Sequence, residues 1–225
     1  MLRRSFFARA GGLAAALGYA PPFDSAQGRP FDPTQGRPDA KPEAATDWRA
    51  ARHDLDNWFD ELPGKHRVLF DTWTASRFPD AIRFAGNIYR ANRDAYNLTE
   101  HELAVVIVCR HETAPFAFND SMWAKYGKAF SKRMGWVDPK TNEPPPTNIH
   151  TRQLSNFIQQ GAHLAVCNLT TRSLSQTLAD ETKRTADEVY KDLTSNTHGN
   201  AHFVPAGVVA ATRAQERGYS IISIG

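Results

Sequence analysis

The sequence predicts an α/β fold: a mostly parallel sheet of five strands with helices on both faces. Short apolar runs alternate with longer segments in which apolar residues recur at helical spacing. One run, LAVVIVC at 103–109, is continuously apolar and rich in β-branched residues, which is typical of a strand buried on both faces of a parallel sheet. A chain of 225 residues, 41% of them hydrophobic, suits one domain of moderate size.

The elements follow one another in strand–helix order along residues 48–225. The expected strands are 66–70, 103–109, 163–167, 201–205 and 219–224. The expected helices are 78–97, 118–130, 148–160, two between Cys167 and Ala201 (the second opened by a capping box at Thr185), and 208–217. In the first helix Tyr96 is expected on the apolar face, and 131–147, with its run of prolines, is expected to be a long loop.

The first twenty residues predict export. Arg3 and Arg4 precede a weakly apolar run at 8–20, the pattern of a twin-arginine signal peptide, and the run is too short and too Gly-rich to be a permanent membrane span. We therefore predict a signal peptide at 1–20, the twin-arginine translocase as a partner during export, and a periplasmic location. Pro21 would hinder signal peptidase, so a membrane tether through the uncleaved signal is an open alternative. The alternative to an export signal is a basic N-terminal tail on a cytosolic protein.

Residues 21–47 are predicted to be a disordered linker. They contain an imperfect tandem repeat, PFDSAQGR at 22–29 followed by PFDPTQGR at 30–37. Only Phe23 and Phe31 could be buried, so ordering this segment would not offset the lost backbone entropy. We interpret the repeat as a spacer ahead of the domain at 48–225.

Charge and cysteine content exclude several classes of function. The net charge of +3 rests on three arginines of the signal, which holds no acidic residue, so the chain without residues 1–20 is formally neutral. A nucleic-acid partner is therefore not expected. Two cysteines are too few for a disulfide scaffold and lack zinc-site spacing, and no nucleotide-binding loop is present, so we predict no cofactor.

Five strings of the folded domain carry a resemblance to a known family. GAHLAVCNLTTRSLSQTLAD (161–180) and AHFVPAGVVAATRAQERGYSIISIG (201–225) are similar to the DsrE/DsrF-like family of sulfur-relay proteins. HRVLFDTW (66–73), VVIVCRHETAPFAFND (105–120) and MWAKYGK (122–128) resemble exported members of that superfamily. The resemblance spans Leu62–Gly225. It implies a three-layer α/β/α domain, assembly into homo- or hetero-oligomers with related subunits, and a persulfide carried on a strand-terminal cysteine.

Cys167 is the candidate catalytic residue. It ends the third expected strand, where ligands gather in open parallel sheets, and a helix is expected to begin just after it. A helix N-terminus, with Arg172 nearby, would favour the thiolate, which is the nucleophilic form. The alternative is a small apolar residue that closes the core.

A second group of residues could form a polar pocket at the same strand ends. The group consists of Asp71, Cys109, Arg110, His111, Glu112, Asn119 and Asp120. Such a pocket could hold a small ligand or a metal, with His111 as a base or hydrogen-bond donor. A solvated loop with a salt bridge is the preferred alternative to a metal site. His198 and His202 are expected on the surface.

Two hypotheses of function follow. In the first, the protein is an exported sulfur-handling protein with sulfane sulfur on Cys167. In the second, it is a non-catalytic oligomeric module that binds a small ligand or metal in the pocket that contains Asp71, His111, Glu112 and Asp120.

Overall fold

The computed structural model describes Phe23–Asp24, Arg29–Pro30 and residues 49–225. The chain divides into two units, Met1–Arg49 and Ala50–Gly225. The predicted signal peptide lies outside the described residues. In the first unit β1 (Phe23–Asp24) pairs antiparallel with β2 (Arg29–Pro30), within the segment predicted to be linker.

The second unit is built on a five-stranded sheet in which every strand pair is parallel. Its order is β6-β5-β4-β3-β7. The strands are β3 (His66–Thr72), β4 (Leu103–Cys109), β5 (His163–Cys167), β6 (Ala201–Val204) and β7 (Ser220–Ile224). The predicted α/β/α fold is confirmed, and all five strands lie at their expected places. Every residue of the central strand β4 is buried, as its continuous apolar run predicts.

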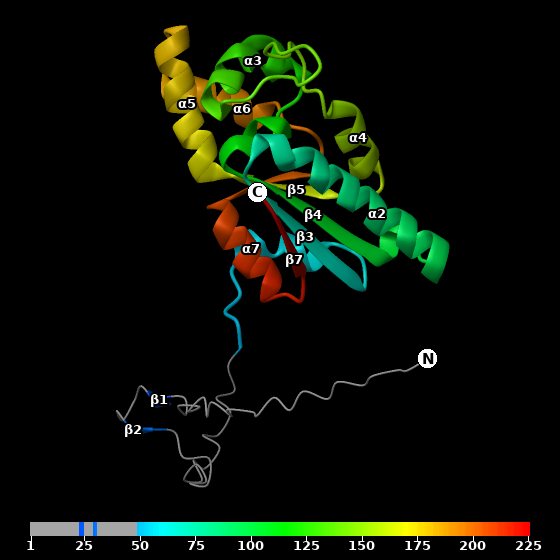
Figure 1. Ribbon diagram of the computed structural model, residues 1–225. Coiled ribbons are helices and arrows are strands. Elements are labelled where there is room, and N and C mark those ends of the chain that lie inside the picture. The colour runs from blue at the N-terminus through cyan, green and yellow to red at the C-terminus, as the bar shows by residue number, and fades with distance from the viewer. Residues whose placement is uncertain (1–22, 25–28, 31–48) are drawn as a thin grey trace, which may run out of the picture. The chain divides into compact units, whose positions relative to one another are not determined.

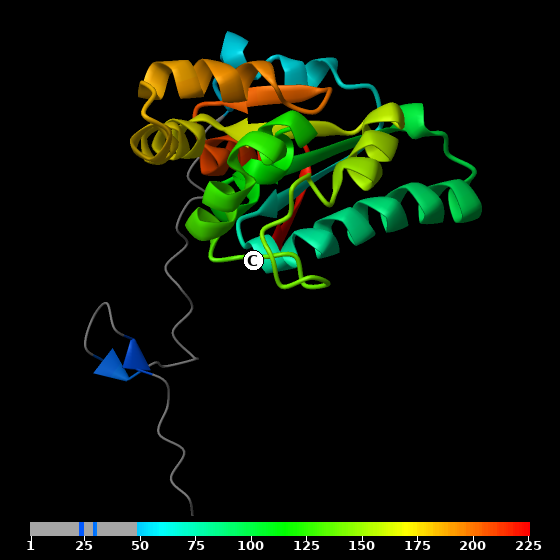
Figure 2. The same cartoon turned by 90° about the horizontal axis from the view of Figure 1, so that it is seen from above.

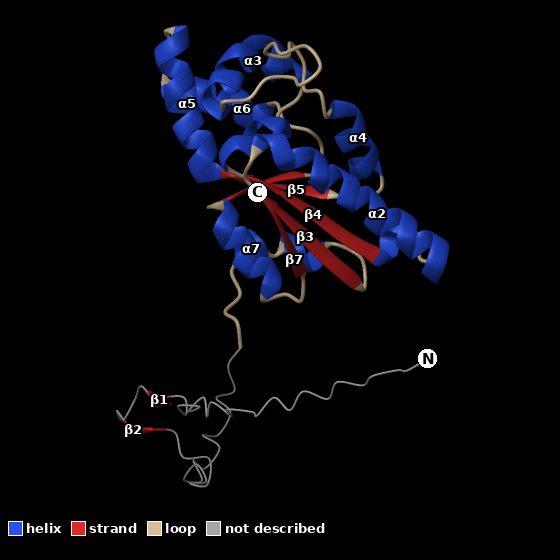
Figure 3. Ribbon diagram, in the orientation of Figure 1, coloured by secondary structure: helices blue, strands red, loops and turns tan. Residues whose placement is uncertain are grey.

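The order of the strands decides which face of the sheet each helix covers. From β3 to β6 the chain adds strands in one direction, and right-handed crossovers place all the intervening helices on one face. These helices are α2 (Phe78–Tyr96), α3 (Asp120–Met134), α4 (Thr151–Gln159), α5 (Asn168–Thr182) and α6 (Ala186–Ser195). The chain then returns past β3 to β7, so α7 (Gly207–Gln215) lies on the opposite face (Figures 1 and 3).

Figure 2 shows how the helices of the larger layer divide the sheet between them. The α2 helix lies toward the β3 and β7 edge, whereas α5 and α6 lie toward β5 and β6. Short 3-10 segments complete the connections: η1 (Asp54–Asp56), η2 (Ala75–Arg77), η3 (Glu100–Glu102) and η4 (His111–Ala117).

Two apolar cores lie on the two faces of the sheet. Alternate residues of β4 belong to each core: Val105, Ile107 and Cys109 face the helices of the larger layer, and Val106 and Val108 face α7. This alternation, which follows from strand geometry, assigns each strand-end residue to a face.

The structure corrects some details of the prediction. Tyr96 is exposed, because it is the last residue of α2, next to the left-handed cap at Asn97. The α3 helix continues to Met134 and α4 begins only at Thr151, so the loop between them lies at 135–150, a few residues later than expected. A short helix, α1 (Trp58–Glu61), was not predicted and contributes the fully buried Phe59 to the core on the α7 side. No helix in the described part of the chain is long and apolar enough to cross a membrane.

Candidate functional site at the carboxyl edge of the sheet

The carboxyl ends of β5 and β6 form a point at which the chain leaves the sheet in opposite directions. The α5 helix follows β5 onto one face, and α7 follows β6 onto the other. In open parallel sheets, ligands bind in the crevice at such a switch point. The first turns of α5 and α7 both begin there, so their free backbone N–H groups lie at this edge.

Cys167 occupies this switch point. It is the last residue of β5 and the N-cap of α5, which begins directly at Asn168 without an intervening loop. The residue is 5% exposed, and its carbonyl oxygen accepts a hydrogen bond from the Thr171 hydroxyl at 3.0 Å. The predicted position of Cys167, between a strand end and a helix start, is therefore what the structure shows.

Cys109 has a different environment. It is 0% exposed, lies in the larger core, and is not bonded to Cys167, since both cysteines are free. Burial raises the pKa of the Cys109 thiol to about 12, because an apolar core disfavours the thiolate. Cys109 is therefore a core residue and not part of a polar pocket.

Asp71 and Arg110 form a bidentate ion pair at the same edge. Arg110 Nε and Nη2 donate to the two carboxylate oxygens of Asp71 at 2.7 and 3.0 Å, and both side chains are mostly buried. The guanidinium also lies 4.8 Å from the ring centre of Trp73. The first residue of α7, Gly207, packs so closely on Arg110 that a Cβ there would lie 2.7 Å from Arg110 Cδ. The pair thus anchors α7 to β3 and β4.

Strand register places this ion pair on the same face of the sheet as Cys167. Cys109 pairs with Val166, so the extended Arg110 continues the register beside Cys167. Adjacent strands lie about 4.8 Å apart, so the two residues are neighbours at the α7 side of the edge.

His111 and Glu112 lie in the loop that follows. His111 has a left-handed backbone with φ of 50°, and its N–H donates to the Thr170 hydroxyl at 3.2 Å. The Glu112 carboxylate accepts a hydrogen bond at 3.0 Å from the N–H of Ala75, the first residue of η2. It is therefore engaged by the backbone and is not a free base. The structure brings Asp71, Arg110, His111 and Glu112 to one edge, largely bonded to one another or to backbone.

Asn119 and Asp120 do not join this group, contrary to the expectation of one shared pocket. The Asn119 side chain caps α3 by accepting from the Ser121 N–H at 3.1 Å. Asp120 accepts from the Asn148 N–H at 3.0 Å and the Thr151 hydroxyl at 2.6 Å, which ties α3 to α4. The reason is that η4 carries the chain from the strand end into the larger helical layer before α3 begins.

Three further expectations are corrected. Arg172 pairs with Asp187 at 3.6 Å and lies over the Tyr190 ring, so it is directed to α6 and away from Cys167. His198 is buried. His202 is half-buried, with its Nε2 2.8 Å from His163 Nδ1. Within the described residues, no group of three or more histidine, cysteine, aspartate or glutamate side chains could hold a metal ion.

Apolar side chains border the switch point. Leu169, in the first turn of α5, is 67% exposed, and Val208, in the first turn of α7, is 54% exposed. The sequence alone did not identify Leu169 or Val208 as site residues. Both could be recognised once the strand order shows that α5 and α7 begin at the same edge of the sheet.

Comparisons with known proteins do not assign the chain to a family. No family model matches it, and no curated protein matches it. Among solved structures, a protein of unknown function from Methanobacterium thermoautotrophicum aligns with 71% of this chain and 99% of its own length. The two are 16% identical, with a TM-score of 0.41.

Proposed function

We propose that the protein is an exported sulfur-handling protein, similar to the DsrE/DsrF-like family, in which Cys167 carries sulfane sulfur as a persulfide. The observation that supports this most is the position of Cys167 at the switch point between β5 and β6, where it is the N-cap residue of α5 and its thiol makes no capping hydrogen bond. The first turn of a helix favours negative charge, and a thiolate is the nucleophilic form of cysteine.

The proposed step needs a persulfide donor and no external oxidant. The Cys167 thiolate attacks the outer sulfur of the donor, R–S–SH. A new S–S bond forms as the donor's S–S bond breaks, the electron pair leaves with the donor as R–S⁻, and Cys167 becomes Cys–S–SH. Transfer to an acceptor thiolate is the same exchange in reverse.

The apolar border supports a protein as donor or acceptor. Leu169 and Val208 lie in the first turns of the two helices that begin at this edge and are exposed, so a partner subunit or relay protein could cover them while it delivers sulfur. This is also the basis on which we propose an oligomer or a complex with related subunits.

The alternative, a non-catalytic module with a ligand or metal pocket, has less support. Asp71 is engaged by Arg110, Glu112 by the Ala75 N–H, and Asp120 by a different part of the fold. The carboxylates of that pocket are therefore committed to structural contacts.

The test is intact-mass analysis of the full chain after incubation with glutathione persulfide. We expect a gain of the mass of one sulfur atom that reducing agent reverses. Cys167→Ser should lose this gain, while Cys109→Ala, the matched control, should keep it. An unmodified wild-type chain, or a gain that survives in Cys167→Ser, would show that Cys167 is not a sulfur carrier.

A further inference from the structure

A hollow lies at the opposite, amino-terminal edge of the sheet. It has a volume of about 320 Å³ and is lined by Glu100, His101, Asn156, Gln159 and Gln160. This volume is at the lower end of those of small-molecule sites. The hollow shares no residue with the carboxyl edge, and neither the sulfur-relay proposal nor its alternative uses it.

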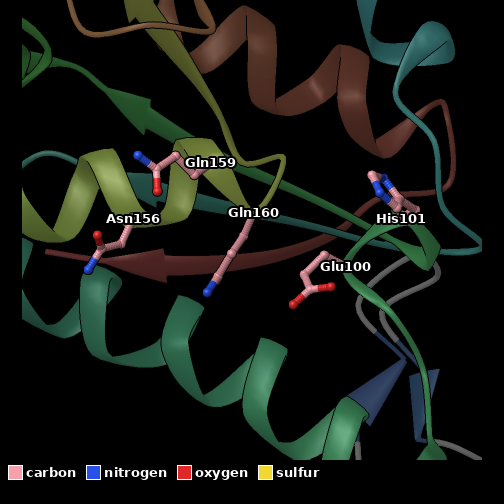
Figure 4. A pocket seen from close by; sticks show the side chains of 5 residues that line it. All are labelled: Glu100, His101, Asn156, Gln159 and Gln160. Atoms are coloured by element: carbon pink, nitrogen blue, oxygen red, sulfur yellow. The ribbon is translucent and has the colours of Figure 1, made fainter.

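The topology explains why these residues meet. The η3 segment leads into β4 and the end of α4 leads into β5, and β4 and β5 are adjacent parallel strands. Their preceding connections therefore lie side by side, over the second half of α2. In Figure 4 the side chains of Glu100 and Gln160 are directed into the same space above α2.

The Glu100 carboxylate is free to meet a ligand. Its neighbour Glu102 accepts from the Thr99 N–H at 3.0 Å in a capping box, so that carboxylate is committed to the backbone. The Glu100 side chain has no hydrogen-bond or ion-pair partner among the described residues, although its backbone oxygen accepts from the Leu103 N–H.

Two buried polar atoms beside this space also lack a partner. They are Gln160 Oε1 and Tyr89 Oη, both unpaired among the described residues. An unpaired buried polar atom is unfavourable, so native structures usually satisfy such atoms with water or a ligand. Burial, and then the negative charge of Glu100, raise the pKa of Tyr89, so its hydroxyl stays neutral.

The electrostatics of the hollow select the charge of its ligand. Glu100 contributes a full negative charge, and α4 ends at Gln159, so the negative end of the helix dipole faces the same place. Gln160 Oε1, buried in the free protein, adds an acceptor when its amide turns toward the hollow. An anion would be repelled by each of these groups, whereas a group with several N–H donors and a positive charge matches them.

We propose that this hollow binds a small primary ammonium compound. The ammonium group would donate to the Glu100 carboxylate and, once the Gln160 amide turns to bring its buried Oε1 into the hollow, to that oxygen as well, with the exposed amides of Asn156 and Gln159 available to polar substituents of the ligand. Recognition rests on N–H donors as well as on charge.

The test uses the full chain, ethanolamine as the probe, and amide chemical shifts in NMR. We expect saturable shifts centred on Glu100, Gln160 and Gly161, with a Kd on the order of 1 mM for so small a ligand. Choline carries the same charge but has no N–H donor on its nitrogen. Its affinity should therefore be at least about tenfold lower than that of ethanolamine.

Variants separate the site from general charge effects. Glu100→Gln should weaken ethanolamine binding about tenfold or more, and Glu143→Gln, an exposed loop change, should leave it unaltered. Gln160→Met should also weaken binding, yet it should not destabilise the free protein, because it removes an unpaired buried oxygen. Shifts that do not saturate, equal binding of choline, or unchanged binding by Glu100→Gln would each overturn the proposal.

Discussion

Cys109 and Cys167 end neighbouring strands of the sheet, yet they point to opposite faces. In the parallel pairing of β4 with β5, Cys109 lies beside Val166, and paired residues of adjacent strands share a face. Cys109 and Val166 both belong to the larger core, so Cys167, one residue later, faces the α7 side. Thiols directed to opposite faces cannot form a disulfide without backbone movement.

This arrangement predicts unequal reactivity of the two thiols. In the native full chain, iodoacetamide should label Cys167, and it should label Cys109 only after denaturation, because that thiol is fully buried and its pKa is raised to about 12. Peptide mass spectrometry measures both. Faster labelling of Cys109, or a linked Cys109–Cys167 peptide, would contradict the assigned faces.

The Asp71–Arg110 pair should be important for stability. Asp71→Asn leaves a mostly buried guanidinium without its carboxylate, so the free energy of unfolding should fall by about 3–5 kcal/mol in urea titration. Asp94→Asn breaks the exposed pair with Arg93 and serves as the control, with an expected loss below about 1 kcal/mol. Similar losses in the two variants would show that the buried pair contributes nothing special.

The strands could be predicted because their signal is local. The run at 103–109 and its shorter counterparts carry β-branched and apolar residues whose burial follows from the parallel sheet. The position of Cys167 at the end of β5 followed from the same local reading.

The pairings of the site could not be predicted in this way. Asp71 and Arg110 are 39 residues apart and meet only through strand register. Asp120 and His202 were misplaced for the same reason: the path of η4 and the pairing of β6 with β5 decide their neighbours, and spacing along the chain does not show either.

Gly207 and Gly86 should respond oppositely to alanine. At Gly207 an added Cβ would lie 2.7 Å from Arg110 Cδ and 3.0 Å from Val108 Cγ1, so Gly207→Ala should destabilise the protein by about 1–3 kcal/mol. At Gly86, inside α2, the nearest atom would be 3.5 Å away, and Gly86→Ala should stabilise by about 0.5–1 kcal/mol. Thermal unfolding compares them, and a neutral Gly207→Ala would refute the close packing of α7 on Arg110.

Export can be tested at residues that lie outside the described part of the chain. Arg3→Lys combined with Arg4→Lys should leave the protein in the cytoplasm, because the paired arginines are the recognised feature of a twin-arginine signal. Fractionation of cells that express the tagged full chain measures this, with Arg9→Lys as the control that retains export. A double variant that still reaches the periplasm would argue against this signal.

His150 should make the stability of the protein depend on pH. Its ring lies 5.2 Å from that of Phe78 and 4.8 Å from that of Phe116, and burial lowers its pKa from 6.5 to about 4. As pH falls below 6.5, the unfolded chain therefore binds the proton first, and stability is lost on the way to pH 4. The loss from this group approaches about 1.4 kcal/mol for each pH unit.

His150→Phe removes the titrating ring and keeps an aromatic side chain among its aromatic neighbours. The difference in unfolding free energy between about pH 7 and about pH 5 should shrink by roughly 1–2 kcal/mol relative to the wild type. His53→Gln, at an exposed position, should leave that difference unchanged. Urea titrations at the two pH values measure this difference for the wild type and for both variants. An unaltered pH dependence in His150→Phe would mean that His150 is not the buried neutral imidazole that its aromatic surroundings indicate.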